Sequence, residues 1–215
     1  SQAVITQAFK QKDIKTVEKV YYKSSVSMFF VAAALLMIIW GNIHNILRIL
    51  PDEYSQGKWV VFFIGLGFVF NMLGSVSGQL IKFSKYYRVE SLIMLVIMFI
   101  VILLNKILIP VFGITGAALA TTFTYLILTG LRWIFIWRKL GLQPFGKYHL
   151  LVLIAITAIY FLTGLIPEMK LIPDLIIRNL IILVLLLVFT KYSKVSPEVN
   201  TLIDKALIMS RFKKK

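Results

Sequence analysis

Blocks of about 20 apolar residues recur along the chain, and short polar or basic segments separate them. A helix needs about 20 apolar residues to cross roughly 30 Å of hydrocarbon, where no water is present to bind open backbone groups. Strands of a membrane barrel would alternate apolar and polar residues, and these blocks do not alternate. The pattern therefore predicts an all-α fold, a polytopic membrane bundle of six transmembrane helices. The six expected spans are 24–50, 58–83, 89–109, 113–137, 149–166 and 174–190.

The two ends of the chain are polar and basic. Residues 1–23 carry apolar side chains at helical spacing, which predicts a short amphipathic surface helix in a cytoplasmic loop. Residues 191–215 predict a basic cytoplasmic tail. Pro51 and Pro110 are expected to end the first and third spans. Because the chain starts at Ser1 in a segment unlike a signal peptide, we expect a fragment of a longer protein.

Charge and composition support the membrane interpretation and give it an orientation. The chain is 59% hydrophobic, with a mean hydropathy of +0.87 and a net charge of +15. Nineteen of its 24 Lys and Arg residues fall in 1–23, 82–88, 132–147 and 191–215, and five fall in the alternate connections. Basic loops face the cytoplasm, so both ends of the chain are expected there. The charge thus indicates membrane lipids as partners, and no nucleic acid.

Known catalytic signatures are missing from the sequence. It contains no Cys, two His, no phosphate-binding glycine loop, no H-E-x-x-H and no G-x-S-x-G. The nine Asp and Glu residues are scattered, and none lies near the centre of an expected span, so proton or sodium coupling through a carboxylate gains no support. We therefore expect no catalytic residues, no metal site, no cofactor and no enzymatic activity.

Polar side chains inside two of the spans are the candidates for a substrate path. Asn42, Asn45 and Arg48 share one face of the first span by three-residue spacing. They could line a path for an anionic or hydroxylated substrate, or they could form helix–helix hydrogen bonds while Arg48 reaches the interface. Both interpretations remain open from the sequence.

The second span carries Asn71, Gln79 and Lys82, which face either a cavity or neighbouring helices. Arg132 and Arg178 lie near span ends, where they are expected to anchor the helices at the headgroups. Small residues predict close helix contacts, through a G-x-x-x-G spacing and a Gly- and Ala-rich stretch. The expected packing residues are Gly74, Gly78, Gly113, Gly116, Ala117 and Ala120.

Several short segments occur in an order that resembles one known family. They are 8–25, LRILPDEY at 47–54, FSKYYR at 83–88, Asn105 followed by IPVFGITGAALAT at 109–121, and QPF at 143–145. In this order they resemble the C-terminal half of bacterial polysaccharide and oligosaccharide flippases, in the multidrug/oligosaccharidyl-lipid/polysaccharide exporter superfamily. The resemblance extends from about residue 3 to residue 190.

The resemblance implies a two-lobe transporter of 12 to 14 helices, of which these six would form most of one lobe. A missing N-terminal lobe of the same protein would then be a partner. The implied function is the movement of undecaprenyl-pyrophosphate-linked oligosaccharide across the membrane by alternating access, for polysaccharide or lipopolysaccharide biosynthesis. Arg48 and Lys82 are the hypothetical contacts for pyrophosphate or acidic sugar.

Three other functions remain as alternatives. A multidrug or metabolite exporter of the same superfamily would require a buried carboxylate. A membrane glycosyltransferase or ligase would require a large polar outer loop, whereas the expected outer loops are only a few residues long. A structural membrane subunit would require neither feature.

Overall fold

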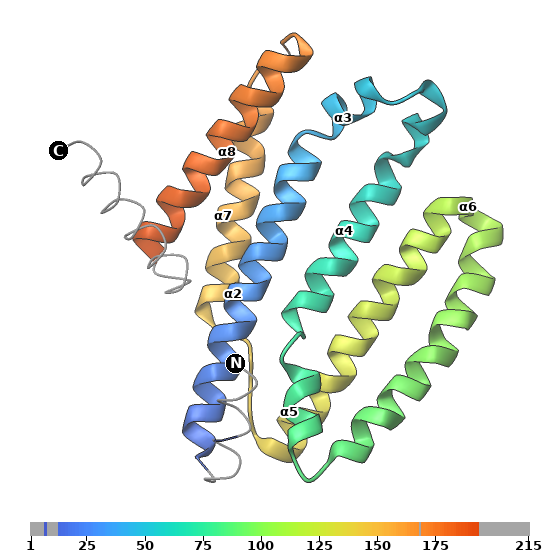
Figure 1. The fold of residues 1–215 in the computed structure, drawn as a ribbon, viewed down its shortest axis with the longest axis vertical. Helices are drawn as coiled ribbons and strands as arrows, with labels where there is room; N and C mark the ends of the chain where they lie inside the picture. Colours follow the sequence, from blue (N-terminus) through green and yellow to red (C-terminus); the bar gives the residue numbers. More distant parts are fainter. Residues whose placement is uncertain (1–6, 8–12, 168, 194–215) are drawn as a thin grey trace.

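The computed structural model describes residue 7 and residues 13–167 and 169–193 of the 215-residue chain. Each element in these ranges is a helix (Figure 1). The elements are α2 (Ile14–Gly41), α3 (Ile43–Ile49), η1 (Asp52–Gly57), α4 (Lys58–Leu73), α5 (Ser77–Phe83), α6 (Tyr87–Leu140), α7 (Lys147–Gly164) and α8 (Leu171–Ser193). Within the described ranges, five helices are long and apolar enough to span a membrane, with α4 and α5 together forming one of them. The expected all-α fold is confirmed.

The longest helix, α6, folds back on itself and forms two arms that lie side by side (Figure 1). The reversal occurs at Gly113, whose φ of 56° and ψ of −134° are readily available to glycine alone. The predicted end of the third span at Pro110 is therefore wrong, because Pro110 lies inside the helix and the chain turns three residues later. Counting the arms separately gives six long apolar segments instead of five.

Helix α2 begins at Ile14, before the expected start of the first span at residue 24. Asp13 caps it by accepting a hydrogen bond from the Thr16 amide at 3.1 Å. The end of the 1–23 segment is therefore continuous with the first span, and the earlier part, apart from residue 7, lies outside the described residues. The expected tail beyond residue 193 also lies outside them.

Two of the expected spans are interrupted. The first breaks at Asn42, between α2 and α3, and the second breaks between Leu73 and Ser77, where α4 gives way to α5. Hydroxyl groups from other helices bond to carbonyls at the second break: Ser25 Oγ donates to Leu73 O at 3.0 Å, and Thr129 Oγ1 donates to Phe70 O at 2.9 Å. Buried carbonyls that leave a helical ladder require such partners in lipid.

The connections alternate between the two ends of the bundle. At the end drawn lowest in Figure 1, called the lower end here, lie the start of α2, the α5–α6 turn and the α6–α7 segment. At the upper end lie α3, η1, the reversal of α6 and the turn between α7 and α8. The lower end thus holds the described parts of the segments that are richest in Lys and Arg. The charge pattern predicts that these segments lie together, and the structure confirms this for their described parts.

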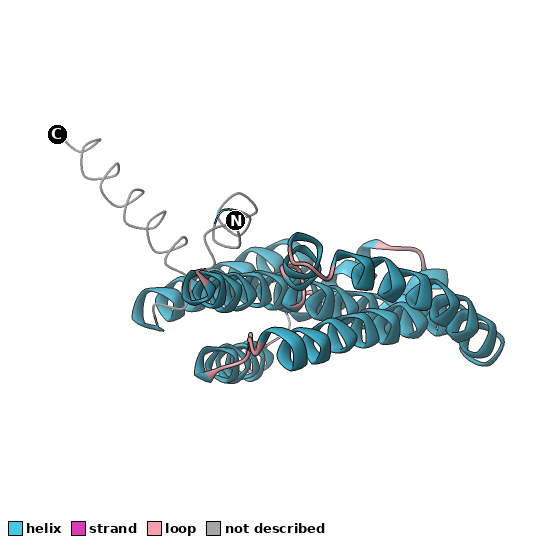
Figure 2. Ribbon diagram, turned by 90° about the horizontal axis from the view of Figure 1, so that it is seen from below, coloured by secondary structure: helices cyan, strands magenta, loops and turns pink. Residues whose placement is uncertain are grey.

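Seen from below, the helices form a flat, elongated slab (Figure 2). Helix α2 contributes to two apolar cores within it. Val17 and Tyr21 belong to the core that α2 shares with α5 and α6, and Val26 and Phe30 belong to the core that it shares with α7 and α8. Movement of α2 would therefore disturb both cores.

Candidate functional site

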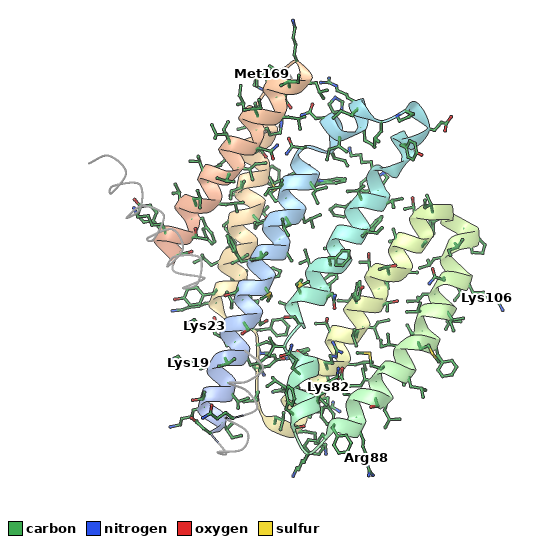
Figure 3. The ribbon with its side chains drawn as sticks, viewed as in Figure 1. Lys19, Lys23, Lys82, Arg88, Lys106 and Met169 are labelled. Atoms are coloured by element: carbon green, nitrogen blue, oxygen red, sulfur yellow. The ribbon has the colours of Figure 1, made fainter. Side chains whose placement is uncertain are left out.

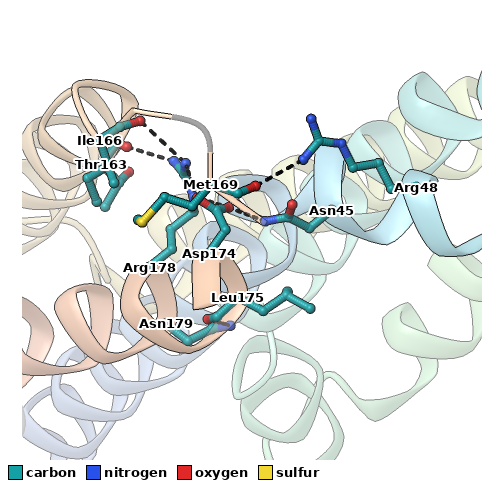
Figure 4. Close-up of polar contacts among 9 residues, drawn as sticks. All are labelled: Asn45, Arg48, Thr163, Ile166, Met169, Asp174, Leu175, Arg178 and Asn179. Atoms are coloured by element: carbon teal, nitrogen blue, oxygen red, sulfur yellow. Dashed lines mark hydrogen bonds and ion pairs between the residues drawn. The ribbon is translucent and has the colours of Figure 1, made fainter. Parts of the chain in front are cut away.

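Five polar residues lie together at the upper end, and we call them the upper network. They are Asn42, Asn45, Asp174, Arg178 and Asn179. Three of them, Asn42, Asn45 and Asp174, are buried. Arg178 donates to both carboxylate oxygens of Asp174 at 3.1 Å, and Asn45 Nδ2 donates to the same carboxylate (Figure 4). The Asp174 side chain is enclosed, since only 3% of the residue is exposed. The upper network therefore joins α3 to α8 through a charged hydrogen-bonded pair.

Arg178 extends the upper network to α7 by donating to Thr163 O at 2.7 Å. Its side chain is 12% exposed and pairs with Asp174. The expectation that Arg178 anchors the helix at the interface stays a prediction. An Asp and an Arg four residues apart on a helix are neighbours, and this spacing was the available sequence signal for the pair. The mutual neutralisation explains how both charges lie between helices.

The helix break at Asn42 is held by the same network. Asn42 Nδ2 donates to Ile38 O at 2.8 Å and to Asn179 Oδ1 at 3.0 Å. The Oδ1 atoms of Asn42 and Asn45 are buried and accept no hydrogen bond from the described part of the chain. The two amides thus form helix–helix hydrogen bonds and retain unused acceptors, which are uncommon in buried polar groups.

Arg48 lies next to the upper network, and its Nη1 atom is 3.5 Å from Met169 O (Figure 4). It is exposed, unlike the two amides on the preceding turns. The structure therefore brings Asn42, Asn45 and Arg48 to one end of the bundle, with the two amides buried and Arg48 exposed.

Glu90 and Arg132 form a second buried ion pair, which we call the lower pair. Arg132 Nη2 and Nε both donate to the Glu90 carboxylate, the latter at 3.3 Å, so the two arms of α6 are joined across 42 residues of sequence. Glu90 is 2% exposed and Arg132 is 8% exposed. Arg132 thus pairs inside the protein, and its expected position at the headgroups stays a prediction.

Gly74 and Gly78 make room for side chains of the second α6 arm. A Cβ atom at Gly78 would lie 2.8 Å from Arg132 Nη2 and 2.9 Å from Glu90 Oε1. A Cβ atom at Gly74 would lie 2.7 Å from Thr129 Oγ1. The close approach predicted from the G-x-x-x-G spacing is present, and Gly78 lies directly over the lower pair.

The other predicted packing residues surround the reversal of α6. A Cβ atom at Gly116 would lie 2.1 Å from Leu108 O, so glycine is required where the two arms meet. Ala120 is fully buried and Ala117 is half-buried. Gly113 is exposed and serves the turn itself through its positive φ.

The three candidates of the second span lie apart from the upper network. Asn71 is half-buried near the end of α4, and Gln79 is half-buried in α5, with an Oε1 atom that accepts no hydrogen bond from the described residues. Lys82 is exposed at the lower end of the bundle (Figure 3). The structure therefore places Arg48 and Lys82 at opposite ends.

A Ser–His contact near the break after α4 was not predicted. Ser25 Oγ donates to Leu73 O at 3.0 Å and lies 3.2 Å from His149 Nε2. These contacts join α2, α4 and α7.

An apolar cleft of about 460 Å³ lies between α2, α4 and α7. Its lining includes Phe29, Met37, Trp40, Trp59, Phe62 and Tyr160. Trp40 and Phe62 lie with ring centroids 4.7 Å apart, and Lys58 Nζ lies 5.5 Å from the Trp40 ring. No pattern in the sequence indicated that Trp40 and Trp59 line one cleft.

Comparisons with protein-family models, curated proteins and solved structures found no match to this chain.

Proposed function

We propose that this chain is part of a transporter that moves a lipid-linked oligosaccharide across a bacterial cytoplasmic membrane. The observation that carries the proposal is the interruption of two apolar helices, at Asn42 and at Gly74, on either side of the apolar cleft. Interrupted helices in lipid are tolerated where the open backbone meets protein or a cavity, and transporters use them at their binding sites.

The chemistry of the cleft and of its surroundings suits an amphiphilic substrate. In this proposal the polyprenyl chain lies against the apolar wall formed by residues such as Phe29 and Trp40. The pyrophosphate would then contact Arg48 at the upper end and Lys82 at the lower end, one at each membrane surface. Cations at the two surfaces would stabilise the same headgroup before and after crossing.

The proposal includes six crossings, with the two α6 arms as separate spans and both ends of the chain in the cytoplasm. It also includes a second lobe, supplied by the rest of the same protein, so that substrate lies between the lobes and is exposed alternately to each side. The resemblance to oligosaccharide flippases supports this arrangement. A single lobe has no opposing wall, and we expect no transport from the 215 residues alone.

Neutralising the two cations tests the proposal in cells that carry the full-length protein. We expect the double variant R48Q/K82Q to lower surface glycan at least about tenfold, while lipid-linked glycan accumulates inside, because each lost phosphate contact costs about 1.5–3 kcal/mol. The measurements are surface glycan by immunoblot and the lipid-linked intermediate by mass spectrometry, at matched protein level. The matched control is R88Q/K106Q, which removes two exposed cations, also from opposite ends (Figure 3). Normal export by R48Q/K82Q would contradict the assignment.

One observation favours the exporter alternative. An exporter of this superfamily would require a buried carboxylate, and both Glu90 and Asp174 are buried, each paired with an arginine. An exporter of apolar cations would also suit the aromatic cleft. Loss of the protein would then raise sensitivity to such compounds while surface glycan stays normal, whereas the flippase proposal expects the reverse.

A further inference from the structure

A polar pocket of about 350 Å³ lies at the lower end, where the first turns of α2 meet the 141–146 segment. We call it the lysine pocket. It is lined by Lys15, Glu18, Lys19, Tyr22, Gln143 and Phe145. The segment between α6 and α7 passes alongside α2 in Figure 1, and Figure 3 shows Lys19 on α2 at this level.

The cationic side of the lysine pocket comes from one helix face. Lys15 and Lys19 are four residues apart on α2, so their side chains are neighbours, and both are exposed. Glu18 also lines the pocket, which leaves one net positive charge among its charged groups. The lysine pocket therefore suits a small anion that carries one negative charge and several hydrogen-bond acceptor atoms.

Tyr22 lies on the same face of α2 as the two lysines, and its ring is held in place. Gly146 lies against Tyr22, since an added Cβ atom would be 2.8 Å from Tyr22 Oη. The Tyr22 ring also packs against His149, with ring centroids 5.9 Å apart, and against Tyr148, with centroids 6.4 Å apart. The Tyr22 ring is thus a packed part of the wall, whereas the two lysines are exposed.

The position of the lysine pocket is that of lipid headgroups. The exposed large apolar side chains of α2 resume at Met28, beyond the pocket along the helix. Exposed aromatic residues, Tyr87 and Trp137, begin and end α6 at the same lower end. Tyr and Trp concentrate at membrane interfaces, and this end is also the lysine-rich one, which faces anionic lipid.

We propose that the lysine pocket binds the phosphate headgroup of an anionic phospholipid of the phosphatidylglycerol type. Lys15 and Lys19 neutralise the phosphate as point charges, and the Tyr22 hydroxyl and the Gln143 amide bond to its oxygens or to the glycerol. The exposed Phe145 ring lies beside the first carbons of the acyl chains. The inference does not depend on the transport proposal.

Native mass spectrometry of the purified chain with added lipid tests this site. Wild type is expected to retain dioleoyl-phosphatidylglycerol in preference to dioleoyl-phosphatidylcholine. The variant K15Q/K19Q should bind phosphatidylglycerol roughly ten- to thirtyfold more weakly, from the two lost surface charges. E18Q should bind it more tightly, because a like charge is removed from the pocket. The matched control, K85Q/R88Q, removes two exposed charges from the α5–α6 region and should bind like wild type.

Three results would overturn the proposal. The first is equal binding of the two lipids by wild type, and the second is an equal loss in K15Q/K19Q and K85Q/R88Q, which would indicate attraction by the basic surface as a whole. The third comes from a separate arm with inorganic pyrophosphate: if it displaces phosphatidylglycerol at equal concentration, the pocket recognises free phosphate and not a lipid. Unfolding midpoints close to that of wild type verify that each variant is folded.

Discussion

Replacing Arg132 by Met is expected to destabilise the protein by about 3–5 kcal/mol, because Glu90 would remain buried without its partner. The lower pair is the only contact of opposite charges that the described residues show between the two α6 arms. The loss should appear as a lower midpoint of unfolding in a mild detergent, followed by circular dichroism with added denaturant.

The double variant Glu90→Leu with Arg132→Met distinguishes the contribution of the ion pair to stability from the cost of a buried charge without a partner. Its stability should return close to that of wild type, because apolar side chains of similar volume often replace a buried ion pair without loss. Arg138→Met is the matched control, since Arg138 is exposed in the same helix and should change stability by less than about 0.5 kcal/mol. Equal stability of R132M and R138M would show that Glu90 is not held as the structure places it.

The second large effect is expected from Gly116→Ala at the reversal of α6. The added Cβ atom would lie 2.1 Å from Leu108 O and 2.5 Å from the Leu108 carbonyl carbon, so the backbone of one arm must move. Overpacking of this kind costs about 1–3 kcal/mol or more. The same denaturation experiment measures the loss.

Gly130→Ala is the control, because it makes the same chemical change in the same helix. An added Cβ atom at Gly130 meets no described atom within 4 Å, and alanine favours a helix over glycine by about 1 kcal/mol. G130A should therefore be as stable as wild type or more so. If G116A were equally stable, the two arms would not meet as the structure shows.

Long-range structure was predictable where a local pattern repeats. Runs of apolar residues indicated the helices, and the alternation of Lys and Arg grouped the correct connections at one end. Gly78 and Gly116 were identified as close-contact positions from their spacing with other small residues. The helices and close contacts are indicated within one turn or one span, and the grouping of the connections by a pattern along the whole chain.

The interruptions at Asn42 and Gly74 were not predictable, because their partners come from elsewhere in the chain. Asn42 is held by Asn179, and the carbonyls near Gly74 are held by Ser25 and Thr129. Apolar composition alone favours a continuous helix at both places. The helices are interrupted because hydroxyl and amide groups from distant parts of the chain bind the polar groups there.

The two ion pairs show the same contrast. Asp174 and Arg178 are one helical turn apart, so their contact had a local signal. Glu90 and Arg132 meet only because α6 folds back at Gly113, and no spacing in the sequence indicates that contact. The apolar cleft likewise depends on how α2, α4 and α7 lie together.

Topology mapping with single cysteines tests the central claim, that α6 crosses the membrane twice and the chain crosses it six times. These 215 residues contain no cysteine, so each introduced thiol is the only one in this part of the protein. Suitable positions are Ile114, which is 72% exposed at the reversal, and Lys85 and Gln143, which are exposed at the lower end. In intact cells, a membrane-impermeant maleimide should label I114C alone, and K85C and Q143C only after permeabilisation. Labelling of I114C from the same side as K85C and Q143C would contradict the account.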